Sequence, residues 1–342
     1  MILDGDTLDL APGIGDLVRD DDGNAVKPEL HQSVLEIATE PAATVADAGA
    51  QLRRLREMVR ERAADRGLRV AAAGTHPFGS WEDQLISPSE RYRTLIDELG
   101  FVARQEVIFG LHVHVAVDDP DTAIRVANGM RNHTPLLLAL SANSPYWEGT
   151  ETGMASARTP IFAQFPRVGL PPRYADWEDW LRRMEFMIRA GMVEDHTWFW
   201  WDVRVSPGFG TVETRVMDCQ TRVEHTLGLA ALVQALVREL AEGGPAPVVP
   251  DELLAENRWQ AARYGVEGEL VDLPSSHRVP VAQLARRALD RAREHADDLG
   301  AGDALEALDD LLEKGNGAMH QRKVYAANQD FRELVRDLAD AT

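Results

Sequence analysis

The sequence predicts an α+β fold, because its strands lie next to one another and its helices gather late in the chain. Two stretches with strand patterns, 197–205 and 211–218, flank the turn at 206–210, so we expect a hairpin of adjacent strands. From Asp251 onward almost every segment has the pattern of a charged amphipathic helix. This order favours α+β over a doubly wound parallel sheet.

The first half of the chain alternates between helical and extended patterns. Residues 45–66 place apolar side chains on one face of a helix, which Gly67 ends. The glycines and proline of 74–80 indicate a structured loop. The other elements expected here are a strand at 68–73, a helix at 89–99, a strand at 111–117, a helix at 120–132 capped by Asp118 or Asp119, and an apolar continuation at 136–140.

The second half begins with a long passage rich in glycine and proline, 146–172. Its length exceeds an ordinary connection, so we expect a lid or a binding loop there. Helices follow at 176–190 and 223–241, on either side of the hairpin. The chain is expected to be mostly helical from about residue 220.

Composition and charge exclude several classes of protein. The 342 residues are 44% hydrophobic, which is globular rather than disordered. The 36 basic and 56 acidic residues give a net charge of −20, so neither nucleic acid nor an anionic membrane is an expected partner. Cys219 is the only cysteine, which fits a reducing compartment. No signal peptide and no apolar run near the roughly 20 residues of a membrane helix is visible, so we expect a cytoplasmic protein.

Two histidines share one face of the strand expected at 111–117. Side chains alternate across a strand, so His112 and His114 lie opposite Leu111, Val113 and Val115. Two adjacent imidazoles suit contacts to a metal or a phosphate. Hydrogen-bonded histidines on an exposed sheet face explain the spacing equally well.

An acid and an arginine share one face of the strand expected at 211–218. Glu213 and Arg215 alternate there with Val212, Thr214 and Val216. The pair fits a metal-binding carboxylate beside an arginine that holds a phosphoryl group. A cross-strand ion pair is the commoner explanation of such a pattern.

Glu29 and Glu36 form a third candidate. Glu36 lies among apolar residues, where a buried ionised carboxylate needs a cation. Within one strand the two acids would face opposite sides, so both reach one site only if Glu29 precedes the strand. The alternative is an edge strand with solvated acids.

In combination, these segments resemble the glutamate–cysteine ligase type 2 family, carboxylate–amine ligases related to glutamine synthetase. The resemblance runs from about Leu8 to the last helices. The motifs that carry it are Glu29…Glu36, Gly74-Thr75-His76-Pro77-Phe78, Gly110-Leu111-His112-Val113-His114, Leu140-Ser141-Ala142-Asn143-Ser144-Pro145, Gln164-Phe165-Pro166-Arg167-Val168-Gly169 and Glu213-Thr214-Arg215.

The resemblance implies a single ligase domain over 1–342. Its fold would be a curved, mainly antiparallel sheet of the glutamine synthetase type, with helices packed on one face. The implied reaction, a step of glutathione-type thiol biosynthesis, uses ATP to phosphorylate the γ-carboxylate of glutamate. The amine of cysteine, or another small amine, then attacks the acyl phosphate. Phosphoryl transfer depends on positioning and charge neutralisation, which Mg²⁺ or Mn²⁺ on carboxylates and an arginine supply.

The same resemblance assigns roles to individual side chains. Arg215 would stabilise the transferring phosphoryl group. His112 would contact metal or nucleotide, and His114 would contact nucleotide. The implied metal ligands are Glu36, Glu213, Glu29 and His112, and the implied anchors of substrate carboxylates are Arg158 and Arg167.

One departure from the family concerns the start of the chain. Family members usually begin with a strand resembling Gly-Val-Glu-Glu-Glu-Phe, whereas Met1-Ile2-Leu3-Asp4 matches only the segment after that strand. A start codon assigned too far downstream would explain this. We then expect the recorded chain to have feeble activity and an upstream extension to restore it.

Two alternatives to glutamate–cysteine ligase activity stay open. One is ligase chemistry on another acid or amine, and the other is an inactive paralogue that binds nucleotide or amino acid. Sheet edges of such folds often pair between subunits, which would make a homodimer.

Overall fold

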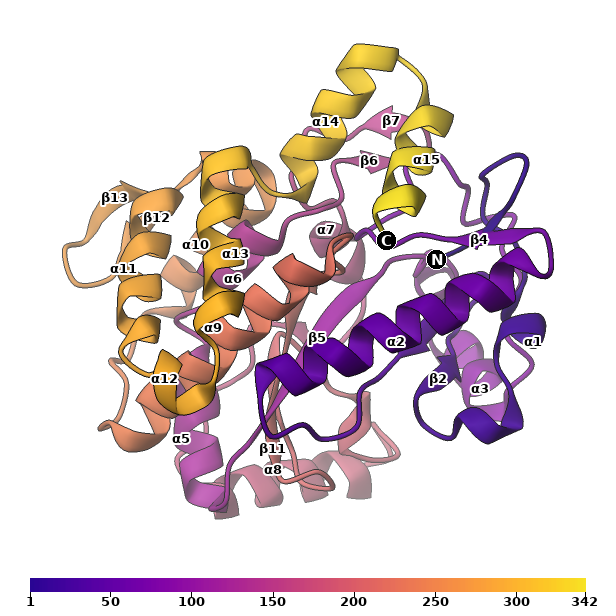
Figure 1. Ribbon diagram of the computed structural model, residues 1–342. Helices are drawn as coiled ribbons and strands as arrows, with labels where there is room; N and C mark the ends of the chain where they lie inside the picture. The colour runs from indigo at the N-terminus through magenta and orange to yellow at the C-terminus, as the bar shows by residue number, and fades with distance from the viewer.

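A three-stranded antiparallel sheet lies at the centre of the computed structural model, which describes residues 1–342 (Figure 1). Its strand order is β10 (Val203–Ser206), β11 (Thr211–Asp218) and β5 (Gly110–Ala116). The first two strands form the expected hairpin, and β11 pairs along its other edge with β5. An irregularity between Thr214 and Met217 shifts the register of that second ladder.

The remaining strands form five two-stranded sheets. These are β1 (Ile2–Asp4) with β4 (Leu68–Val70), β2 (Val26–Pro28) with β3 (Leu35–Ile37), β6 (Tyr146–Trp147) with β7 (Thr150–Glu151), β8 (Val168–Gly169) with β9 (Trp200–Trp201), and β12 (Glu269–Asp272) with β13 (His277–Pro280). Only β8 and β9 run parallel. The strands are thus mainly antiparallel, but they do not join into one continuous sheet. Pro28, which has no N–H to donate to a ladder, is the last residue of β2.

Fifteen α-helices surround these sheets, and local side chains set several of their ends. Asp119, Thr44 and Asp176 each accept a backbone N–H as N-caps of α5, α2 and α8. The helices are α1 (Ile14–Leu17), α2 (Val45–Ala64), α3 (Glu90–Leu99), α4 (Phe101–Arg104), α5 (Pro120–Met130), α6 (Thr134–Ser141), α7 (Arg158–Phe162), α8 (Trp177–Arg189), α9 (Val223–Glu242), α10 (Asp251–Tyr264), α11 (Val281–Arg293), α12 (Ala296–Leu299), α13 (Gly302–Lys314), α14 (Gly317–Asn328) and α15 (Phe331–Ala341).

The helices cover the apolar face of the central sheet. Val113, Val203, Val205 and Val212 point to this face and join a core of 46 buried residues, to which α5, α6 and α9 contribute heavily. Figure 1 shows α9 beside α13, with the later orange helices on the same side of the molecule. Because side chains alternate along a strand, the polar side chains of the same strands lie on the opposite face of the sheet.

Several expected elements differ from the observed ones. Residues 197–205 do not form one strand but a 3₁₀ turn (His196–Trp198) followed by β9 and β10, with Asp202 at the break. Asp202 forms a buried ion pair with Arg258 of α10, a contact remote in sequence. The hairpin β12–β13 interrupts the helical second half, and the passage 146–172 contains β6, β7, α7 and β8.

None of the helices combines the length and the apolar character needed to cross a membrane.

Candidate active site

Glu213 is the centre of a polar cluster on the uncovered face of the central sheet. The register places Arg204 of β10 opposite Glu213 on one side and His114 of β5 opposite it on the other. Arg215, two residues along β11, shares this face, as does His112 on β5. The alternation therefore correctly predicted that each pair shares a face, and the pairing of β5 with β11 brings the two pairs together.

The Glu213 carboxylate is held from several directions and is only 1% exposed. Arg204 Nε donates to Oε2 at 2.5 Å, Ser206 Oγ donates to the same oxygen at 3.2 Å, and Arg215 Nη1 donates to Oε1. The imidazole nitrogens His112 Nδ1 and His114 Nε2 lie 3.7 and 3.6 Å from Oε1. Glu213 thus fixes the positions of both arginines.

Charges around Glu213 decide the protonation of the cluster. Burial alone would raise the pKa of Glu213, but Arg215 and the other cationic neighbours hold it well below its usual range, so it is ionised. Burial and Arg215 lower the pKa of His112, and burial lowers the pKa of His114. Neutral imidazoles with side chains 31% and 36% exposed have lone pairs or N–H groups available to a ligand.

Glu29 and Glu36 approach the same cluster from the β2–β3 hairpin. Glu29 lies just beyond β2 and Glu36 lies within β3, so the two acids are not on one strand. Burial and the nearby Glu36 raise the pKa of Glu29 to about 7, while Arg215 opposes that shift. Both acids can reach one site only if Glu29 lies outside the strand of Glu36, and this condition is met.

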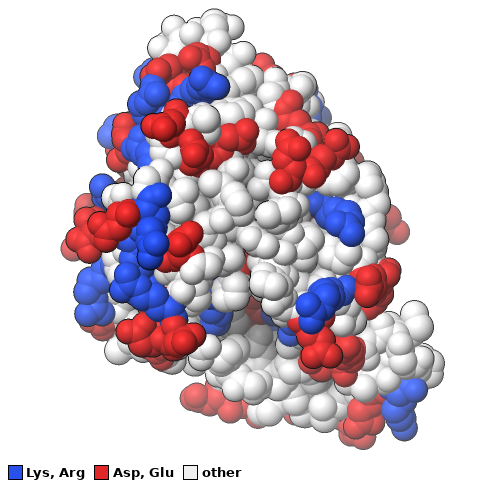
Figure 2. Space-filling view, turned by 90° about the vertical axis from the view of Figure 1, so that its right-hand side faces the viewer, with Lys and Arg blue, Asp and Glu red and all other residues white.

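Figure 2 shows the side of the molecule that carries β2 and α3. A hollow opens there among mixed acidic and basic side chains.

Glu106 and Arg204 are members of the cluster that the sequence analysis missed. Burial raises the pKa of Glu106 to about 8, Arg158, Glu29 and Arg215 are its charged neighbours, and its Oε2 is buried without a hydrogen-bond partner. Arg204 could have been found, since it alternates with Val203 and Val205 in the first strand of the hairpin. Glu106 precedes β5 in no recognisable motif.

The two arginines of the long passage lie in different surroundings. Arg158 is buried beside the cluster, where Nη1 lies 3.9 Å from Asp218 Oδ1 and the Nε atom has no partner. Arg167 instead donates to the Trp198 carbonyl at 3.1 Å and to Glu98 at 3.4 Å, and it stacks on Trp200. The structure therefore brings Arg158, but not Arg167, to the cluster.

The donor set fits a divalent cation only in part. No three or more His, Cys, Asp or Glu side chains lie close enough together to hold a metal ion. Both oxygens of Glu213 already accept from arginines. Glu29 and Glu36 are held less firmly, since Glu29 accepts the Leu30 N–H at 3.3 Å and Glu36 Oε1 lies 3.7 Å from the half-exposed Lys27 Nζ. Glu29 and Glu36 lie close enough for their charges to interact, and Glu106 Oε2 has no hydrogen-bond partner. Their carboxylate oxygens are hard ligands of the kind that Mg²⁺ and Mn²⁺ prefer.

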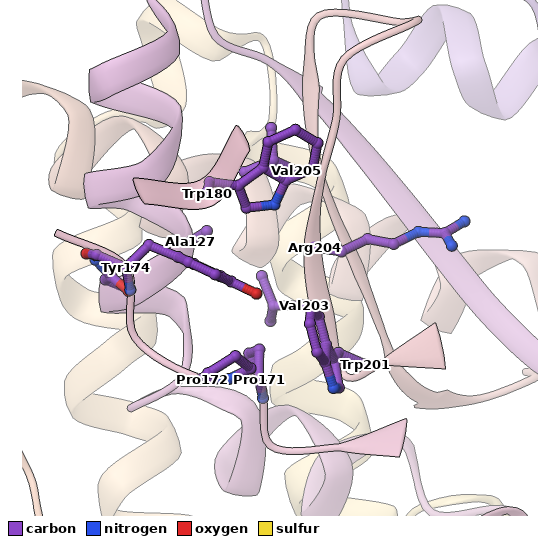
Figure 3. Close-up of a pocket in the computed structure, with 10 residues that line it drawn as sticks. Ala127, Pro171, Pro172, Tyr174, Trp180, Trp201, Val203, Arg204 and Val205 are labelled. Atoms are coloured by element: carbon purple, nitrogen blue, oxygen red, sulfur yellow. The ribbon is translucent and has the colours of Figure 1, made fainter. Parts of the chain in front are cut away.

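A small cavity lies behind β10, on the face away from the cluster (Figure 3). Val203 and Val205 point towards Tyr174 and Trp180 there, whereas Arg204 points away from them. The volume of about 10 Å³ holds no more than a single water, so this cavity is not a substrate site.

The fold matches that of a solved ligase over nearly the whole chain. The crystal structure of glutamate–cysteine ligase from Francisella tularensis, in complex with AMP, superposes with a TM-score of 0.71 over 99% of this chain and 86% of that one, at 12% identity. The architecture is therefore that of a glutamate–cysteine ligase.

Proteins of similar sequence show to which family of ligases the chain belongs. A Rubrobacter xylanophilus protein named "Putative glutamate–cysteine ligase 2-1" is 42% identical over 100% of this chain and 92% of its own length. A Solibacter usitatus protein named "Putative glutamate–cysteine ligase 2" is 38% identical over 93% of this chain and 83% of its own. The model of glutamate–cysteine ligase family 2 matches residues 6–341, and the chain belongs to that family of ATP-dependent ligases, which form a carbon–nitrogen bond.

Proposed function

We propose that this protein joins glutamate to cysteine at the expense of ATP, through a γ-glutamyl phosphate intermediate. The observation that carries the proposal is the convergence of Glu213, Arg215 and two neutral histidines with the acids Glu29 and Glu36. Phosphoryl transfer needs anionic ligands for a divalent cation and fixed positive charge for the phosphoryl oxygens, and this cluster offers both.

Arg215 is the residue we assign to the transferring phosphoryl group. Its Nη1 is bound to Glu213, whereas its Nε is buried and has no hydrogen-bond partner. An unpartnered buried N–H next to a fixed ion pair is prepared to donate to an incoming anion. Glu213 therefore acts as a positioning residue that holds the guanidinium in place.

The acids Glu29 and Glu36 would hold Mg²⁺ or Mn²⁺, with His112 or Glu106 as further neighbours. Bound there, the cation would neutralise phosphate charge. His112 and His114 line the same face with partly exposed rings, so they would contact the nucleotide.

Arg158 would anchor the carboxylate of an amino-acid substrate. Its buried Nε lacks a partner, and the charge of Asp218 only partly balances the guanidinium. Arg167 is engaged elsewhere, so we do not include it in the site.

The architecture supports two finer points of the proposal. Mainly antiparallel strands with helices on one face are consistent with the curved sheet of the glutamine synthetase type. The 46-residue core draws on segments from Val45 to Leu311, which supports a single ligase domain over 1–342.

The deciding experiment measures phosphate release from ATP with pairs of amino acids, and identifies the product by mass spectrometry. Glutamate with cysteine should give γ-glutamylcysteine, and Arg215→Gln should slow its formation by about 10²–10³-fold. Exposed Arg189 forms no ion pair, so Arg189→Gln is a matched control that should keep the activity. Turnover with a different pair would show another substrate, and nucleotide binding without turnover would show an inactive paralogue.

The intermediate has its own test. Hydroxylamine attacks acyl phosphates, so glutamate, ATP and hydroxylamine without cysteine should yield glutamyl hydroxamate. Amide formation with cysteine but no hydroxamate would contradict the acyl phosphate.

A further inference from the structure

A second, larger pocket lies apart from the ligase cluster. It has a volume of about 350 Å³ and lies between the start of α5, residues 173–176 and the connection at 245–246. The helix α5 packs against the apolar face of the central sheet, whereas Glu213 occupies the opposite face. The pocket is therefore not part of the cluster, and its size falls in the range of small-molecule sites, about 300–1,000 Å³.

Arg173 is the unsatisfied cation of this pocket. Its guanidinium forms no ion pair, and its Nη1 is buried without a hydrogen-bond partner. Burial and the nearby Arg131 lower the pKa of Arg173, and Asp251, which pairs with Arg131, only partly offsets this shift. A buried donor without a partner is costly, and an incoming carboxylate would satisfy it.

The other polar groups of the wall are mostly committed to the protein. Arg125 donates to the backbone carbonyls of Leu240, Ala241 and Gly243 at the end of α9. The Asn128 side chain forms hydrogen bonds with the backbone N–H and carbonyl of Tyr174. These bonds fix the shape of the pocket and leave Arg173 as the cation free to bind a ligand.

Two carboxylates face the same space. Asp121 accepts the Trp177 N–H through Oδ1, and Asp176 accepts the Asp179 N–H through Oδ1, so each keeps a second oxygen without a partner. These acids would repel a simple anion, and Arg173 would repel a simple cation. A ligand that carries both charges avoids both penalties.

We propose that this pocket binds a zwitterion, namely an amino acid whose carboxylate pairs with Arg173 and whose ammonium group meets Asp121 and Asp176. The proposal does not depend on the ligase reaction, so it can be tested without ATP.

The test is calorimetric titration of the full chain with L-alanine, propionate and ethylamine. Propionate lacks the ammonium group of alanine and ethylamine lacks its carboxylate, so each should bind at least about tenfold more weakly than alanine. Arg173→Gln and Asp121→Asn should each weaken alanine binding about tenfold or more. Asp121→Asn keeps a side-chain oxygen that accepts the Trp177 N–H. It therefore still tests the proposal if Arg173→Gln fails to fold.

Two further variants distinguish this pocket from other sites. Arg189→Gln makes the same charge change on an exposed part of α8, and Arg158→Gln removes the proposed anchor of the substrate carboxylate in the ligase cluster; both should bind alanine like the wild type. The proposal is overturned if the wild type does not bind alanine, or if propionate or ethylamine binds as tightly. It is also overturned if Arg173→Gln has no effect, or if a folded Arg158→Gln protein loses the binding.

Discussion

Arg204 and Glu213 face each other across the β10–β11 ladder, and Arg204 Nε donates to Glu213 Oε2 at 2.5 Å. Arg204 also donates to the carbonyls of Thr197 and Phe199, so one guanidinium ties the hairpin to the turn before β9. The same carboxylate holds Arg215 on its other oxygen. The orientation of Arg215 thus depends on a residue of the neighbouring strand.

Replacement of Arg204 by methionine should destabilise the protein and reduce its activity. The change removes a charge-assisted hydrogen bond to a buried carboxylate, worth about 1.5–3 kcal/mol. Urea unfolding should show a lower free energy of unfolding, with Arg189→Gln as the control. A variant as stable and as active as the wild type would show that Arg204 does not position the cluster.

Arg215→Lys and Arg215→Gln should separate charge from geometry. A lysine keeps the charge but loses the planar fork, so kcat should fall, and glutamine should lower it further, by about 10²–10³-fold. The KM for ATP should change much less than kcat if Arg215 acts mainly in the transition state. Steady-state kinetics with varied ATP provide the measurement, and an unchanged kcat in Arg215→Gln would exclude the assigned role.

Local pattern was enough to predict most helices and the faces of the site strands. Period-two alternation placed His112 with His114 and Glu213 with Arg215, and one of the two expected caps, Asp119, begins the helix α5. These features depend on residues a few positions apart, so a single sequence contains them.

Features set by distant contacts were not predictable. The pairing of β5 with β11 joins segments about a hundred residues apart, and nothing local specifies it. At the break between β9 and β10, Asp202 pairs with Arg258 of a later helix, a partner that the local sequence does not indicate. Glu106 joins the cluster through the path of the chain before β5, which is why no motif revealed it.

Glu106 should make stability depend on pH. Its pKa rises from 4.5 to about 8 in the folded protein, so the folded state keeps a proton that the unfolded state loses. The contribution of Glu106 to stability is therefore full below pH 4.5, falls as the pH rises towards 8, and is constant above that. Glu106→Gln should flatten this part of the curve of unfolding free energy against pH. Exposed Glu82→Gln is the matched control, and an equally steep curve in Glu106→Gln would contradict the burial of an uncompensated acid.

Binding of Mn²⁺ should release a proton from the Glu29–Glu36 pair. Because the pKa of Glu29 is about 7, this carboxyl is partly protonated near neutral pH, and a cation must displace that proton to bind. Calorimetry in two buffers of different ionisation enthalpy, at pH 6.5 and at pH 8.5, measures the number of protons released. We expect a release at pH 6.5 that shrinks at pH 8.5 and is lost in Glu29→Gln together with much of the affinity. Tight binding to Glu29→Gln with the same proton release would place the cation elsewhere.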